Sequence, residues 1–101
     1  MKFNFNEPLV GLDLKPVLQE GKEANLGKLL GNHLNGMTGE GDSIKIRGWG
    51  IKMWSGEDIE LDESDLELLK GLIKKLPMAT HLVRGQALTL LNRKPAPKTG
   101  Q

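Results

Sequence analysis

The acidic residues of this sequence gather after its second tryptophan, in a stretch whose spacing must be tested against a metal site. This stretch, 57–67, holds seven of the thirteen acidic side chains. Asp58, Glu60 and Asp62 alternate as the first ligands of a calcium-binding loop do. The glycine that such a loop needs is replaced by Glu63, and its closing bidentate acid by a leucine. We expect helix capping and solvation to explain these acids, with a partner-binding acidic patch as the next interpretation.

A second stretch, 21–29, is similar at first sight to a phosphate-binding loop. Gly21 and Gly27 are one residue too far apart for that motif, although Lys28 follows the second glycine as it should. Leu29 stands where the motif requires a hydroxyl that holds magnesium. We therefore expect no nucleotide binding here.

Catalysis and metal binding find little support elsewhere in the chain. His33 and His81 are far apart in sequence, and neither has a neighbouring nucleophile and acid in a catalytic spacing. The chain has no cysteine, which excludes disulfides and thiolate metal sites. We expect no catalytic residues, no cofactor and no metal, and hence a protein that is not an enzyme.

Length and composition predict one small domain. The chain has 101 residues with 38% apolar side chains, enough for a single core. Its net charge of +1 argues against a dedicated polyanion binder. The first ten residues lack the apolar run of a signal peptide, and no stretch is long and apolar enough to span a bilayer. We expect a cytoplasmic protein with no membrane contact.

The N-terminal half predicts a hairpin followed by a helix. Residues 2–6 alternate polar and apolar side chains, and 9–17 form a looser second strand, so an N-terminal β-hairpin is expected. A polar loop over 19–23 then precedes a helix over 24–34 with a leucine stripe. Gly27 and Gly31 lie inside this helix at a spacing that lets another backbone approach closely, within the domain or in a helix dimer.

The segment 44–54 is compatible with either a hairpin or a helix. Two isoleucine-containing arms around a glycine-flanked Trp49 fit a tight hairpin. A helix capped by Asp42 or Ser43 and ended by Gly56 fits equally well. We expect Trp49 to face the core and Trp54 to lie at its boundary, but the choice between helix and hairpin decides where Trp54 points.

The C-terminal half has clearer signals. A short extended piece at 59–61 predicts a third strand, and Asp62 begins a capped helix that ends before Pro77. Thr80 caps a last helix over 81–92. The remaining residues, 93–101, have two prolines and three basic residues, so we expect residues 1–92 to form one globular domain followed by a disordered tail.

The pattern over most of the chain resembles a set of small bacteriophage and prophage proteins to which no activity is assigned. The matching positions are 3–5, 12–13, 28–30, 56, 59–62 and 86–88. The resemblance implies a helix for 44–54 and a phage or prophage origin. Leu14 departs from the glycine expected in the first turn, which argues against a tight hairpin there.

These observations predict an α+β fold: an N-terminal β-hairpin, a short third strand at 59–61, and about four helices that form most of the domain. The predicted function is a phage-type accessory protein that acts by binding another protein or itself. The predicted interface consists of Trp54, Glu57, Asp58 and Glu60. Self-association would use Gly27 and Gly31.

The alternative function is a small nucleic-acid-binding regulator. The last two helices are spaced like a helix-turn-helix, and Lys74, Lys75 and Arg84 would face phosphates. The second of these helices offers one arginine and one glutamine to contact bases, and it is otherwise mostly apolar. An ordinary packed helical hairpin is the simpler interpretation of this pair.

Overall fold

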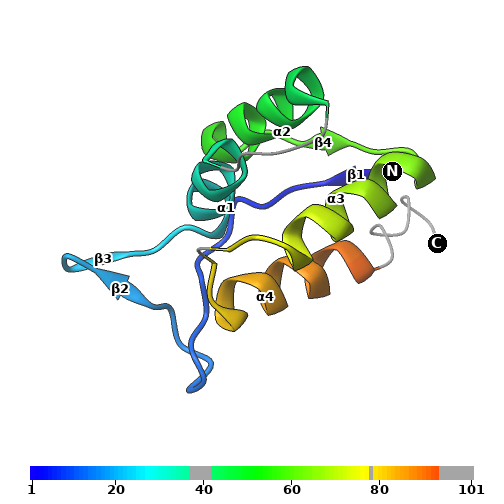
Figure 1. Ribbon diagram of the computed structural model, residues 1–101. Helices are drawn as coiled ribbons and strands as arrows, with labels where there is room; N and C mark the ends of the chain where they lie inside the picture. The colour runs from blue at the N-terminus through cyan, green and yellow to red at the C-terminus, as the bar shows by residue number, and fades with distance from the viewer. Residues whose placement is uncertain (37–41, 78, 94–101) are drawn as a thin grey trace, which may run out of the picture.

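The computed structural model describes residues 1–36, 42–77 and 79–93, which form four helices and two short two-stranded sheets (Figure 1). In chain order the elements are β1 (Lys2–Phe3), β2 (Leu18–Gln19), β3 (Lys22–Glu23), α1 (Leu26–Asn35), α2 (Ser43–Ser55), β4 (Ile59–Glu60), α3 (Glu63–Lys74) and α4 (His81–Asn92). The predicted α+β class with four helices is confirmed. Of the predicted tail, only Arg93 is among the described residues, where it caps α4.

The first strand pairs with a distant segment and not with its neighbour in the sequence. β1 runs antiparallel to β4, with Phe3 opposite Ile59. Both side chains are buried. Their cross-strand contact holds the short sheet against the helices. The third strand expected at 59–61 is therefore present, but the predicted pairing of 2–6 with 9–17 is wrong.

The hairpin of the N-terminal half forms later, from β2 and β3. Its two-residue turn is Glu20-Gly21, with φ of +51° and +80°. Positive φ at both central residues matches the twist of the flanking strands, and glycine adopts it without strain. The polar stretch over 19–23, expected to be a loop, is the end of this hairpin. In Figure 1 the hairpin projects from the helical body.

All four helices begin at a side chain that accepts a hydrogen bond from the backbone of the third residue beyond it. These capping residues are Asn25, Asp42, Asp62 and Thr80. Asp62 accepts from the Asp65 amide at 2.7 Å, which confirms the predicted cap. The segment 44–54 is helical, and it ends at Gly56 in the left-handed conformation, with φ of +74°.

The closest packing in the molecule lies between α1 and α2. A Cβ placed on Gly27 would lie 2.6 Å from the carbonyl oxygen of Met53, and one on Gly31 would lie 2.7 Å from that of Gly50. No side chain fits at such distances, so the two helix backbones meet only because these residues are glycines. The glycine pair therefore serves packing within the domain.

A single core joins the two helix pairs. The buried apolar residues form one cluster that draws on every helix and on β1 and β4. At the surface, Lys45 of α2 donates to Asp65 of α3 at 2.7 Å. This hydrogen bond and the charge of Asp65 raise the pKa of Lys45 above its ordinary value. Across the described ranges, no helix has the length and hydropathy to cross a membrane.

A tight turn follows the first extended segment, although leucine and not glycine stands at position 14. The Leu14 amide donates to the Gly11 carbonyl at 2.9 Å, and the Gly11 amide donates to the Lys15 carbonyl at 2.9 Å. Leu14 has a φ of +63° and is 84% exposed. The turn thus forms with leucine in a strained conformation, and its two arms are joined by the isolated Val10–Pro16 bridge and not by paired strands.

The glycine contact predicts opposite effects of alanine at two positions. Gly31→Ala should lower the free energy of unfolding by about 1–3 kcal/mol, because the new methyl group overpacks the helix contact. The matched control is Gly48→Ala, in α2, where a Cβ would meet no atom within 4 Å. It should raise stability by about 1 kcal/mol through helix propensity alone. Urea titration measures both; equal effects would contradict the close contact.

The strained turn predicts a stabilising glycine. Leu14→Gly relieves a left-handed conformation that costs about 1–2 kcal/mol, against about 0.5–1 kcal/mol of added backbone entropy. We expect a net gain of roughly 0.5–1 kcal/mol in thermal or urea unfolding. Leu12→Gly is the control, because Leu12 is 97% exposed and its φ is not positive. It should destabilise the protein, and a loss of stability in both variants would refute the strain.

Candidate protein-binding surface

The helix α2 has two apolar faces, and only one of them is covered. Trp49, Gly50 and Met53 are buried against the core. The other face, here called the α2 outer face, consists of Ile44, Ile51 and Trp54, which are 87%, 46% and 51% exposed. The burial of Trp49 and the half-exposure of Trp54 agree with the prediction for the two tryptophans. Large apolar side chains exposed in a row mark contact surfaces more often than chance allows.

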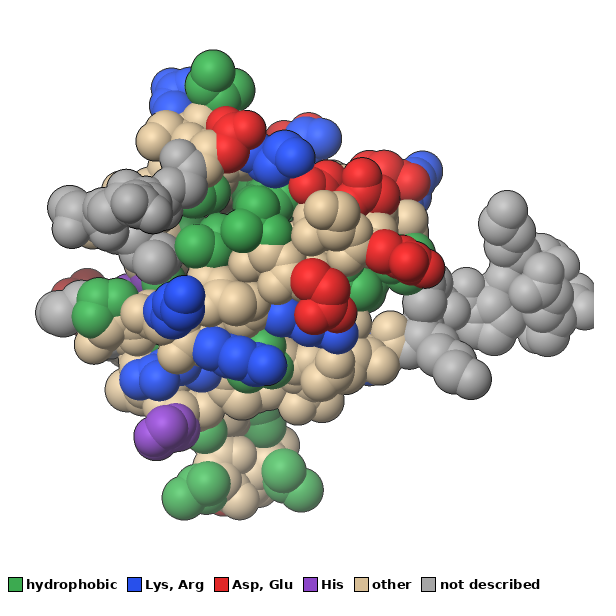
Figure 2. Space-filling view, turned by 45° about the vertical axis from the view of Figure 1, so that its right-hand side comes forward, with side chains coloured by type: hydrophobic (Ala, Val, Ile, Leu, Met, Phe, Trp, Pro, Cys, Tyr) green, Lys and Arg blue, Asp and Glu red, His purple; other side chains and the backbone are tan. Residues whose placement is uncertain are grey.

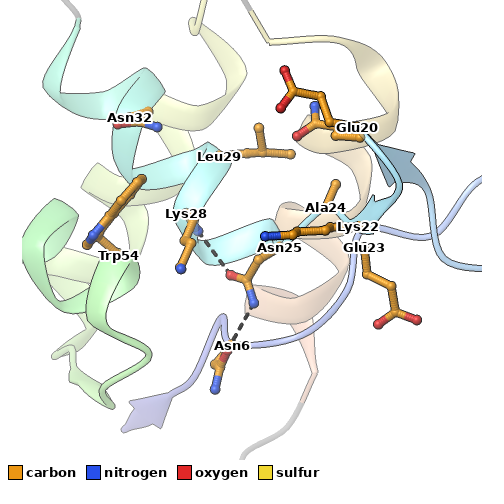
Figure 3. A pocket seen from close by; sticks show the side chains of 11 residues that line it. Asn6, Glu20, Lys22, Glu23, Ala24, Asn25, Lys28, Leu29, Asn32 and Trp54 are labelled. Atoms are coloured by element: carbon orange, nitrogen blue, oxygen red, sulfur yellow. Dashed lines mark hydrogen bonds between the residues drawn. The ribbon is translucent and has the colours of Figure 1, made fainter.

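Trp54 lines two adjoining cavities between α1 and the elements around it. One has a volume of about 960 Å³ and lies between α1, the hairpin and Trp54 (Figure 3). The other, of about 240 Å³, lies between α1 and α2 and is lined by Gly31, Arg47 and Ile51 among others. The two cavities share Asn32 and Trp54. We call the pair the α1–α2 groove.

A lysine and not an acid lies against the exposed tryptophan. The Lys28 ammonium nitrogen lies 5.3 Å from the centroid of the Trp54 ring, within range of a cation–π contact. In Figure 3, Trp54 and Lys28 occupy one side of the larger cavity, and Glu20 and Glu23 of the hairpin occupy the other. The end of the groove at Trp54 is therefore cationic, whereas the hairpin end has mixed charge, because Lys22 lines it together with Glu20 and Glu23.

The acids predicted beside Trp54 do not share its cavities. Glu57, Asp58 and Glu60 are exposed, and neither half of the α1–α2 groove includes them. Asp58 accepts a hydrogen bond from the Asn4 side chain at 2.8 Å. Glu60 lies 3.3 Å from the N-terminal ammonium group. Two of the three acids are thus engaged within the fold, beside the sheet of β1 and β4.

The predicted self-association face is not available. Gly27 and Gly31 are buried, and both meet the backbone of α2. A second copy of α1 cannot approach this face while α2 covers it. The helix-dimer hypothesis at Gly27 and Gly31 is therefore wrong, and tight packing within the domain explains the two glycines.

The predicted nucleic-acid face loses its base-contacting residues to the fold. The Arg84 guanidinium donates to the Ala79 carbonyl through Nε at 3.0 Å and Nη2 at 2.8 Å. Lys74 and Lys75 are exposed, so the alternative now rests on these two residues. The face shown in Figure 2 carries acidic as well as basic side chains, unlike a dedicated polyanion surface.

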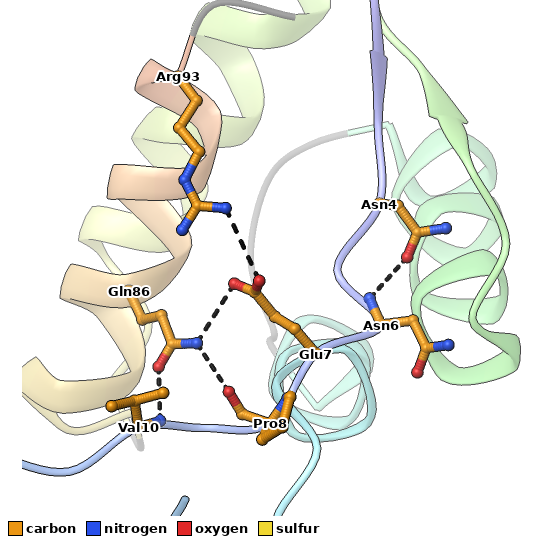
Figure 4. A network of polar contacts seen from close by, with 7 residues as sticks. All are labelled: Asn4, Asn6, Glu7, Pro8, Val10, Gln86 and Arg93. Carbon is orange, nitrogen blue, oxygen red and sulfur yellow. Dashed lines mark hydrogen bonds and ion pairs between the residues drawn. The ribbon is translucent and has the colours of Figure 1, made fainter. Parts of the chain in front are cut away.

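Gln86 of α4 anchors the extended N-terminal segment (Figure 4). Its side-chain oxygen accepts from the Val10 amide at 2.8 Å, and its nitrogen donates to the Pro8 carbonyl at 2.9 Å. The same nitrogen lies 3.3 Å from Glu7, which also pairs with Arg93 at 3.7 Å. The glutamine amide thus pairs with a backbone edge as a neighbouring strand would, and it is not available to contact a base.

Within residues 1–36, 42–77 and 79–93, no cluster of three or more histidine or acidic side chains has a geometry that would hold a metal ion. His81 lines a cavity of about 450 Å³ between α4 and the N-terminal segment.

Comparisons with known protein families, curated proteins and solved structures found no relative of this chain. The resemblance to phage and prophage proteins therefore stays a prediction. The groove residues Lys28, Asn32 and Arg47 were not foreseen from the sequence, because their role depends on how α1 and α2 cross.

The Gln86 contacts predict a marked loss of stability on truncation. Gln86→Ala leaves the Val10 amide without its partner and should lower the free energy of unfolding by about 1–3 kcal/mol. Thr89→Ala is the control, because Thr89 is exposed one turn further along α4. It should change stability by less than about 0.5 kcal/mol. Urea unfolding compares the two, and equal losses would mean that Gln86 is not a structural anchor.

Proposed function

We propose that this chain is a non-enzymatic protein-binding domain that contacts its partner through the α2 outer face. The observation that carries the proposal is the exposure of Ile44, Ile51 and Trp54 on one side of a helix whose other side is buried. Tryptophan is the residue type most enriched among energetically dominant interface contacts. Because the helix is fixed by its buried face, the exposed side chains are held in place before any partner arrives.

The α1–α2 groove supports the same proposal. Trp54 stands at the junction of two cavities, so a partner side chain inserted beside it would be enclosed by α1 as well as by α2. Enclosure excludes water, and contacts of this kind dominate protein interfaces. The proposal includes the phage or prophage origin and cytoplasmic location expected from the sequence, both of which stay predictions.

Site-specific crosslinking tests this function. A photoreactive phenylalanine analogue placed at position 54 should give one discrete protein adduct in an extract of the cells that produce the chain. The same analogue at position 68 is the control, because Leu68 is a 40% exposed leucine on α3, away from the groove. The adduct should be absent there. Equal adducts from both positions, or none from position 54, would contradict the proposed surface.

A captured partner then allows a quantitative prediction. Trp54→Ala should weaken its binding about 30-fold, equivalent to roughly 2 kcal/mol for a dominant interface tryptophan. Leu68→Ala should weaken it less than about threefold, as expected for a residue outside the contact. Calorimetry on the purified pair measures both, with circular dichroism to verify that each variant is folded.

A further inference from the structure

The cations Lys28 and Arg47 of the α1–α2 groove take part in no ion pair among the described residues. Lys28 lies over the Trp54 ring, and Arg47 lines the smaller cavity together with Ile51 and Trp54. Among the described residues, two positive charges without an acidic partner therefore flank an exposed aromatic side chain.

The groove also offers hydrogen-bonding groups beside these charges. Asn32 lines both cavities, and its side chain is exposed. Asn35 lines the smaller cavity and donates to the Gly31 carbonyl at 3.0 Å, which leaves its side-chain oxygen to accept from a ligand. Amides of this kind pair with the backbone of a bound segment as well as with carboxylates.

We infer that the α1–α2 groove binds an acidic segment of another protein, in which a large apolar side chain is flanked by aspartate or glutamate. The apolar side chain packs against Trp54 and Ile51, and the flanking carboxylates pair with Lys28 and Arg47. This assignment rests on the proposed function and specifies its partner. Charge complementarity at a partly enclosed site favours such a segment over neutral or basic ones.

A nucleic acid strand fits the same surface less well. Single-stranded nucleic acid also stacks on aromatic side chains in cationic grooves. However, the far side of the larger cavity is lined by Glu20 and Glu23 together with Lys22, so it does not continue the positive track that a phosphate backbone needs. The α2 outer face also continues from Trp54 to Ile44, which offers aliphatic surface and no stacking platform. A peptide with a few acids matches both features.

A display library of random dodecapeptides, selected on the full chain, tests the inference. Selected peptides should combine aspartate or glutamate with a large apolar residue. Fluorescence anisotropy on the synthesised peptides should show at least tenfold weaker binding to Trp54→Ala, Lys28→Glu and Arg47→Glu. The matched control is Lys52→Glu, which makes the same charge change at an exposed α2 residue that lines neither cavity. It should weaken binding less than about threefold.

The outcomes separate this inference from the proposed function. Binding that depends on Trp54 but not on Lys28 or Arg47 would overturn the acidic segment and leave the protein-binding surface in place. If the selection yields no peptide that depends on Trp54, but the crosslinker at position 54 still gives an adduct, the acidic segment is likewise overturned and the protein-binding surface stands. Failure of both experiments would remove the surface itself. Trp54-dependent, salt-sensitive binding of an oligothymidylate would overturn the inference in favour of single-stranded nucleic acid.

Discussion

The backbone contact between α1 and α2 determines most of what this molecule presents to a partner. Gly27 and Gly31 let α1 approach the carbonyl groups of Met53 and Gly50 at distances that exclude any side chain. This approach turns one face of α2 inward and so leaves the opposite face outward. It also places Lys28 of α1 over the ring of Trp54. The close approach of α1 and α2 therefore produces both the tight packing between these helices and the exposed candidate surface on α2.

The extended N-terminal segment joins this helix pair to the rest of the fold. β1 pairs with β4, and residues further along pair with the hairpin, where the Leu9 amide donates to the Ala24 carbonyl at 2.8 Å. On its other edge the segment is held by the Gln86 side chain of α4. Figure 1 shows it running between the two helix pairs. The contacts that fix its place in the fold, with β4, Ala24 and Gln86, are thus long-range, which explains why local patterns mislead there.

Local signals in the sequence predict α1, α3 and α4, but they leave 44–54, the segment of α2, open between a helix and a hairpin. The Asp62 cap and the inward position of Trp49 depend on neighbours within a few residues, and both are predicted; the Gly56 stop is predicted only if that segment is helical. The partner of β1 is not predicted, since alternation in 2–6 specifies a strand but not what it pairs with. The spacing of Gly27 and Gly31 predicts that another backbone approaches α1 closely. Spacing alone does not decide whether that backbone is α2 or a second copy of the chain. The same limit hid the cations beside Trp54.

The chain is nearly neutral overall, but the fold separates its positive and negative side chains in space. The sequence carries a net charge of +1, which argues against a strongly charged surface. In the structure, however, several acids serve the fold: Asp62 caps α3, Asp65 binds Lys45, and Asp58 binds Asn4. Acids engaged in this way are fixed beside their donors, whereas Lys28 and Arg47 face the α1–α2 groove and have no acidic partner in the part of the chain that the structure describes. A partner approaching Trp54 therefore meets positive charge, although the chain as a whole is almost neutral.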